Sequence, residues 1–404
     1  MSIQMRAAPW PAQEVSTIGA VGVAHFCSHL LQLALAPLFL MMRADLGASF
    51  FALGVVLSVF YLCSGVGQVI AGILVDRFGA DRLLLSGLLL QGAATAAMGL
   101  APHYAVLLPL AALAGLGNAV YHPADLSILS HRVAPQRLGR AFAAHVIAGS
   151  IGFALSPIVS AAIGTAYGWR VSLLAMGGGV VVLGLILLAS RGALKVAPVA
   201  AHRADGTAMK APGFLQVLAM PVVLTAFVYF LLTALTLSGI QSFSIVALQE
   251  GFGATVALAT LAVALFQAGN TTGVAIGGHL ADRTTRHHVV AMTGLVAGAA
   301  FAMLAAVLTV PPVATVGLII LVGASMGLTT PSRDVLVRAA APAGATGKVF
   351  GVVYSGYDIG SLVGPLMFGL MLDHHLPRLV FVGSAIPLAL AVFTAFAVRR
   401  RPAE

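Results

Sequence analysis

Three carboxylates stand inside long apolar stretches of the sequence, where a charged side chain is costly. They are Asp125, Asp334 and Asp358. Acids in such surroundings are usually functional or paired. Asp358 lies near the middle of its stretch beside Tyr354 and Tyr357, so we expect it to take up and release a proton as its surroundings change. Asp125 and Asp334 are further candidates for proton coupling, and a permanently paired structural acid is the alternative.

An arginine within an apolar stretch accompanies these acids. Arg333 follows Asp125 by 208 residues, a spacing that recurs along the chain. The two side chains therefore occupy equivalent places in an internal repeat, and we expect an ion pair between them, with His122 and Asp334 as neighbours. Breaking a buried pair is costly, so it would favour one conformation over another. The pair is either a gate or part of a substrate site.

Histidines form a second group. His25 and His29 stand four residues apart on one helical face, and His145 lies in another apolar stretch. Histidine titrates near neutral pH and binds metals readily. Proton relay, anion contact, metal ligation and helix packing are all open, but two histidines without a third ligand do not amount to a metal site. We therefore expect no metal and no cofactor.

Further polar side chains are spaced along the apolar stretches, where they either line a moderately polar cavity or form interhelical hydrogen bonds. The predicted substrate contacts are His25, His29, Tyr61, Gln68, His122, His145, Gln241, Gln267, Asn270, Arg333, Tyr354 and Tyr357.

The amino-acid composition indicates whether this chain is surrounded by water or by lipid. Of its 404 residues, 60% are hydrophobic and 8% are charged, whereas a soluble domain carries about 25% charged residues. Apolar stretches recur that are long enough to cross a bilayer core, which takes roughly 20 helical residues. The sequence predicts an all-α integral membrane protein, embedded in lipid, and no nucleic-acid partner despite the formal charge of +9.

Twelve transmembrane helices are expected between the polar interruptions. We place them at 17–42, 51–75, 83–101, 105–130, 141–165, 171–190, 214–242, 254–277, 289–310, 313–336, 348–371 and 378–398.

The distribution of basic residues between the two sides of the membrane supports this number of spans. With the N-terminus taken as cytoplasmic, only Arg43, Arg170 and Arg378 fall on the outer side, and the other assigned basic residues fall inside. This asymmetry follows the positive-inside rule. We expect a multi-pass protein of the inner membrane with both termini in the cytoplasm and no removable signal peptide.

The chain is an internal duplication. A shift of 208 superposes Gly115 on Gly323 and Gly152 on Gly360. The longest polar interruption lies between the repeats. We predict two pseudo-symmetric six-helix halves, 1–190 and 214–404, joined by a cytoplasmic linker, 191–213, and a monomer by default because one chain contains both halves.

Matching loops follow the second and eighth spans. The first contains Gly72, Asp76, Arg77 and Arg82, and the second contains Asp282 and Arg283. These loops resemble the signature loop of the major facilitator superfamily, which implies two rocking halves. Glycine allows close approach of helix ends, and the acids and arginines can latch one conformation. Solvated loop charges are the alternative.

A narrower resemblance rests on the run from Gly115 to Pro123, on Gly139-Arg140-Ala-Phe142 and on Ser28-His29-Leu30-Leu31. These residues resemble the fosmidomycin-resistance branch of the superfamily. The resemblance implies proton-driven export of drugs or small organic compounds.

We find no nucleotide-binding loop and no nucleophile elbow in the sequence, so an ion gradient is the expected energy source and no enzyme activity is expected. The predicted function is a proton-coupled secondary transporter that exports a small organic compound. An importer of organic anions, with Arg333 and the histidines as contacts, and a non-transporting membrane sensor are the alternatives.

Overall fold

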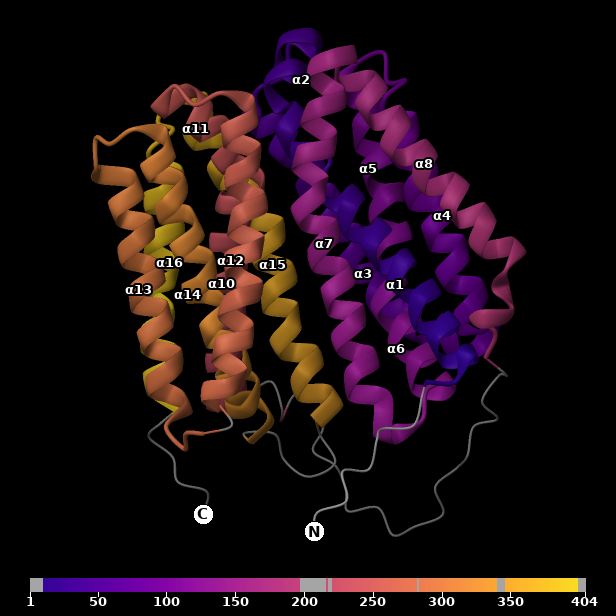
Figure 1. Ribbon diagram of the computed structural model, residues 1–404. Helices are drawn as coiled ribbons and strands as arrows, with labels where there is room; N and C mark the ends of the chain where they lie inside the picture. The colour runs from indigo at the N-terminus through magenta and orange to yellow at the C-terminus, as the bar shows by residue number, and fades with distance from the viewer. Residues whose placement is uncertain (1–9, 197–215, 217–219, 282, 340–345, 399–404) are drawn as a thin grey trace.

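The structure is a computed structural model that describes residues 10–196, 216, 220–281, 283–339 and 346–398. Within these ranges the side chains of residues 76, 334–339, 346–351 and 395–398 are not described. Figure 1 shows two helical bundles side by side, one formed by the first half of the chain and one by the second half.

The N-terminal bundle consists of α1 (Ala12–Gln32), a 3-10 turn η1 (Ala36–Leu38), α2 (Phe39–Leu46), α3 (Phe50–Phe78), α4 (Ala80–Met98), α5 (Tyr104–Asn118), α6 (Tyr121–Arg132), α7 (Pro135–Tyr167), α8 (Trp169–Ala189) and a 3-10 turn η2 (Arg191–Ala193). The C-terminal bundle consists of α10 (Pro221–Ser238), a π-helical turn η3 (Gly239–Phe243), α11 (Ser244–Phe252), α12 (Val256–Ala281), α13 (His287–Val307), α14 (Pro312–Ala339), α15 (Thr346–Asp373) and α16 (Leu379–Val398).

The expected number of spans agrees with these helices. In the described part of the chain, nine helical segments are long and apolar enough to cross a membrane, counting α1 with α2, α5 with α6, and α10 with α11 as continuous spans. The long helices α4, α15 and α16 lie alongside them. The all-helical, twelve-span prediction is confirmed.

One predicted span end is wrong, and one span contains a break that hydropathy did not predict. The first span, expected at 17–42, is interrupted after Gln32 by the turn η1, although Ala12–Leu46 still forms one span. The seventh, expected to end at 242, continues through η3 to Phe252. A π-helical turn adds a residue within a helix without interrupting its apolar character, so hydropathy alone does not locate it. The linker expected at 191–213 is described only as far as Val196.

The two bundles repeat the same close helix contacts. A Cβ atom on Gly115 would collide with the carbonyl oxygen of Phe60, and one on Gly323 would collide with that of Phe266. The equivalent α7 and α15 glycines, Gly152 and Gly360, face α1 and α10 in the same way. Small residues at these positions let helix backbones approach closely. The duplication read from the sequence is therefore a duplication of packing.

Helix ends repeat as well. Gly47 ends α2 with φ 61°, and Gly253 ends α11 with φ 67°. A left-handed residue after a helix favours glycine because a Cβ atom is unfavourable in that conformation. Helices α2 and α11, which these glycines end, lie at the same end of the molecule, and we call it the α2/α11 end (Figure 1).

The bundles meet along two helix pairs, α3 with α15 and α7 with α12. Near the α2/α11 end, α3 and α15 touch through their backbones. A Cβ atom on Gly54 would collide with the carbonyl oxygen of Pro365, and one on Gly369 would lie 2.6 Å from that of Phe50. Farther along, the Ser58 hydroxyl donates a hydrogen bond to the Leu362 carbonyl at 2.7 Å.

Candidate functional site

A cavity of about 420 Å³ lies between the two bundles and takes its walls from both. The N-terminal bundle contributes α1, α6 and α7, and the C-terminal bundle contributes α10, η3, α12, α14 and α15. We call this space the central cavity. Nine of the residues predicted to contact substrate line it: His25, His29, His122, His145, Gln241, Gln267, Asn270, Arg333 and Tyr357.

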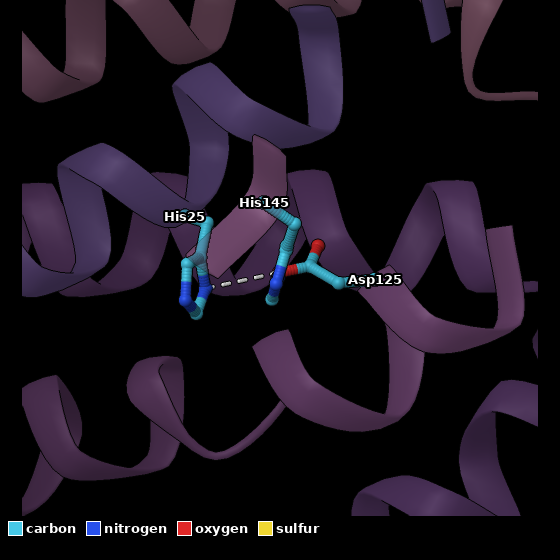
Figure 2. Close-up of side chains that lie close together, drawn as sticks. All are labelled: His25, Asp125 and His145. Carbon is cyan, nitrogen blue, oxygen red and sulfur yellow. Dashed lines mark hydrogen bonds and ion pairs between the residues drawn. The ribbon is translucent and has the colours of Figure 1, made fainter. Parts of the chain in front are cut away.

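A carboxylate and two imidazoles meet at the wall of the central cavity. Asp125 of α6 is fully buried, and its Oδ2 atom lies 2.9 Å from His145 Nε2 of α7 and 3.3 Å from His25 Nδ1 of α1. The His145 contact is a hydrogen bond, whereas the His25 contact has the distance of an ion pair without hydrogen-bond alignment. Figure 2 shows the three side chains converging from their separate helices. We call them the His-Asp-His cluster.

Two more histidines surround this cluster. The His25 ring lies 3.7 Å from the His145 ring, 4.4 Å from His29 and 5.6 Å from His122, measured between ring centroids. The Oδ1 atom of Asp125 has no hydrogen-bond partner among the described residues. A buried carboxylate normally has partners for both oxygens. The arrangement therefore has unused capacity to bind a cation.

The expected ion pair between Asp125 and Arg333 is wrong for this conformation. The close partners of Asp125 are the histidines of its own bundle, at the distances given above. The guanidinium of Arg333 instead lies 4.6 Å from the centre of the Phe230 ring and 6.0 Å from that of Tyr229. Equivalent positions in two repeats need not touch, because each helix also packs within its own bundle. Arg333 nevertheless lines the central cavity, and so do His25 and His145, the two histidines that contact Asp125.

The amide side chains of the C-terminal bundle combine the two roles that the sequence left open. Gln241 Nε2 donates a hydrogen bond to Gln267 Oε1 at 3.1 Å, and Asn270 Nδ2 donates one to the Gly323 carbonyl at 3.4 Å. All three side chains also line the central cavity. They cross-link helices and present polar atoms to whatever occupies the space.

Asp358 lies elsewhere, in a crevice of about 410 Å³ between α3 and α15. Tyr61, Gln68 and Tyr354 line the same crevice, whose other walls are mostly apolar. Gly65 of α3 faces the carboxyl group, and a Cβ atom there would lie 3.1 Å from Asp358 Cγ. Among the described residues, no arginine, lysine or histidine makes an ion pair with Asp358.

Several predicted gating residues fall where little can be said of them. The side chains of Asp76 and Asp334, and the whole of Asp282, lie outside the described residues. Arg77, Arg82 and Arg283 are exposed.

The close helix approach that we expected at Gly72 is absent in this conformation. A Cβ atom on Gly72 would meet no atom within 4 Å. The latch predicted from the loop motif stays a prediction.

Sequence reasoning missed a set of contacts that closes the α2/α11 end. Asp373, at the end of α15, accepts hydrogen bonds from the backbone N–H groups of Phe50 and Phe51 at 2.7 and 2.8 Å, so it caps α3 across the two bundles. Arg43 and Glu250 form an ion pair between the bundles at 3.5 Å. No sequence signal pairs these residues, because each contact joins segments far apart in the chain.

We predict that Asp373→Asn weakens this closure. A carboxylate that accepts two N–H groups at a helix N-terminus contributes about 1–2 kcal/mol, so the population open at the α2/α11 end should rise by roughly 5- to 30-fold. Spin labels on cysteines at Leu100 and Leu308, with Cys27 and Cys63 replaced, should report longer distances. Asp45→Asn is the matched control, because Asp45 binds Arg170 and Trp169 of its own bundle. Equal distances in both variants would contradict a gating role for Asp373.

The sequence and fold of this chain are similar to those of known membrane proteins. Residues 21–246 and 236–404 match the sequence profile described as Major Facilitator Superfamily. A fosmidomycin resistance protein of Escherichia coli K12 is 24% identical over 281 residues, which are 68% of this chain and 66% of the relative. The membrane sensor protein UhpC of Salmonella typhimurium LT2 is 26% identical over 246 residues, which are 57% of this chain and 56% of the relative. The matched stretches thus span less than the full length of either relative.

Solved structures share the fold. A bacterial homologue of the human lysosomal transporter Spinster, in an inward-facing and occupied conformation, superposes with a TM-score of 0.79 over 97% of this chain and 98% of that one, at 15% identity. The nucleoside transporter NupG superposes with a TM-score of 0.77 over 95% of this chain and 99% of that one, also at 15% identity. These similarities show that the chains share a fold, and they do not identify a substrate.

Proposed function

Because the chain belongs to the major facilitator superfamily, whose transporters it resembles in fold, we propose that it is a proton-coupled secondary transporter that exports a small organic compound. The observation that carries the proposal is the central cavity, which is lined by polar side chains of both bundles. A site shared between two repeats is where secondary transporters bind their substrates. A binding site confined to one bundle would give no such means of moving a substrate.

Alternating access is supported by the contacts at the α2/α11 end. Arg43 with Glu250, and Asp373 with the start of α3, hold the bundles together there. With both termini in the cytoplasm, as the basic residues indicate, this end faces away from the cytoplasm and the protein is in an inward-facing state. We propose the inner membrane as its location, with the halves 1–190 and 214–404 rocking about the central cavity as a monomer, joined by the linker 191–213.

Asp358 is the acid best placed to couple protons to this motion. It lies at the contact between α3 and α15, so rocking of the bundles changes its surroundings. Asp125 is enclosed by histidines of its own bundle, whose mutual positions a rigid rocking motion preserves. A coupling residue must differ between the two states, since a group with equal free energy in both cannot bias them. Asp334 stays a third candidate.

Export is supported by the relative named a fosmidomycin resistance protein. The test uses everted membrane vesicles that contain the protein, an internal pH-sensitive dye, and fosmidomycin with a panel of small organic compounds. A compound that makes acidified vesicles release protons while accumulating inside them supports the proposal. Binding without any flux of compound or protons would instead favour a sensor, the function named for the relative UhpC.

Import of an organic anion is a second candidate, favoured by the position of Arg333 on the cavity wall. A guanidinium can bind a carboxylate or phosphate through two parallel hydrogen bonds. If the substrate is such an anion, Arg333→Gln should raise the KM for it by roughly tenfold or more, the effect of losing about 1.5–3 kcal/mol of a charged hydrogen bond. Neutral and cationic compounds should be unaffected. Transport assays with matched anionic and neutral compounds check this, and an unchanged KM for anions would exclude the role.

A further inference from the structure

The structure assigns a metal-binding site to the central cavity: we propose that His25, Asp125 and His145 bind a divalent transition-metal ion such as Zn²⁺, Co²⁺ or Ni²⁺. The sequence paired His25 with His29 and supplied no third ligand. The fold instead brings Asp125 of α6 and His145 of α7 to His25 of α1. This inference is independent of proton coupling and of the direction of transport.

Distances between the ligand atoms fit a small metal ion. Zn²⁺ binds imidazole nitrogen and carboxylate oxygen at about 2.0–2.2 Å, so ligand atoms around a tetrahedral ion lie about 3.3 Å apart. In the cluster, Asp125 Oδ2 lies 2.9 Å from His145 Nε2 and 3.3 Å from His25 Nδ1. One ligand atom from each of the three residues lies within 4.8 Å of the others. The three ligand atoms are therefore already grouped at close to the spacing that a metal ion requires.

Charge and burial favour a cation at this place. Asp125 has no exposed surface, and His25 and His145 are 3% and 5% exposed. Within the described part of the chain, no arginine or lysine forms an ion pair with Asp125. A buried carboxylate without a compensating cation is costly. Neutral imidazoles with a metal ion supply the positive charge without placing several charged rings side by side.

Space for the imidazoles is provided by a glycine of α7. A Cβ atom on Gly149 would lie 2.6 Å from His25 Cδ2 and 3.1 Å from His29 Cε1. The rings of α1 therefore pack directly against the α7 backbone beside His145. Three protein ligands leave a fourth position toward the cavity, as in zinc sites that keep an open position for water or substrate. His122, which also lines the cavity, is close enough to His25 to approach it.

The test is equilibrium binding of Co²⁺ to the full chain in detergent, purified with a tag that contains no histidine. We expect one Co²⁺ per chain with the visible absorption of a low-symmetry site. Asp125→Asn and His25→Ala should each weaken binding by roughly tenfold or more. A variant with His374 and His375 both changed to Ala removes an adjacent pair from a loop edge and should bind as wild type does.

A positive signature guards against variants that lose binding by misfolding. His145→Cys keeps a ligand at the same position, and its Co²⁺ complex should show an added thiolate-to-metal absorption band. Three results would each overturn the site. The band could be absent in folded His145→Cys protein, Co²⁺ binding could disappear only with the His374 and His375 changes, or the wild type could bind no Co²⁺. The last result would leave the cluster as a hydrogen-bonded group with transport unaffected, so failure of this proposal is distinct from failure of the transporter proposal.

Discussion

Asp358→Asn should abolish proton movement driven by substrate while leaving substrate exchange intact. An asparagine amide cannot bind and release a proton, but it fills nearly the same volume in the crevice between α3 and α15. The bundles can therefore still rock around a bound substrate. In proteoliposomes with an internal pH dye, the variant should give the proton flux of protein-free liposomes and should still exchange labelled compound across the membrane.

Two controls make this result specific. Asp358→Glu keeps the carboxyl group and should retain part of the flux. Asp45→Asn removes an acid that binds Arg170 and Trp169 of its own bundle, and should couple normally if it folds. Proton flux that survives Asp358→Asn would assign coupling to another acid, with Asp334 the next to test.

Gly273→Leu should cause the largest loss of stability. Gly273 lies on α12 where a Cβ atom would collide with the carbonyl oxygen of Ala324 on α14. Backbone atoms cannot move aside as a flexible side chain can, so the helices must separate. Overpacking of this kind costs about 1–3 kcal/mol or more, which corresponds to a fall in Tm of roughly 5–10 °C for a domain the size of one half.

The matched control lies on the same helix. A Cβ atom on Gly278 would meet no atom within 4 Å, so Gly278→Leu should leave Tm unchanged or raise it, since leucine has the higher helix propensity. Thermal unfolding followed by size-exclusion chromatography in detergent separates the two variants. Equal Tm values would show that close contact between α12 and α14 is not required.

Much of the fold could be predicted from the sequence because a helix that crosses the lipid bilayer must be apolar over about 20 residues. The twelve spans follow from apolar length, and the match to the superfamily confirms the resemblance drawn from the loop and glycine motifs. The repeated glycines could be found in the sequence, and the equivalent helix contacts of Gly115 and Gly323 explain why they recur. The break after Gln32 and the π-helical turn at Gly239–Phe243 were not visible, because both keep the apolar composition of a span.

The candidate site was predictable in its members and not in its pairings. His25, Asp125 and His145 were each predicted as site residues. Each lies within about two helical turns of the predicted cytoplasmic end of its span, so comparing their depths in the membrane would have suggested that they meet. The wrong pairing of Asp125 with Arg333 came from treating symmetry as proximity. Asp373 was missed because its partners are backbone N–H groups of another bundle, which no side-chain pattern records.

The backbone contacts at Gly54 and Gly369 have a consequence for speed. Where the bundles close through side chains, every cycle must freeze and then release rotamers, which costs free energy for each long side chain ordered. At these two positions α3 meets Pro365 and α15 meets Phe50 without a Cβ atom between the backbones. Closing this part of the interface immobilises little that was mobile before. In the rocking motion that we propose, this part of the surface between the bundles therefore opens and closes with little change in side-chain entropy.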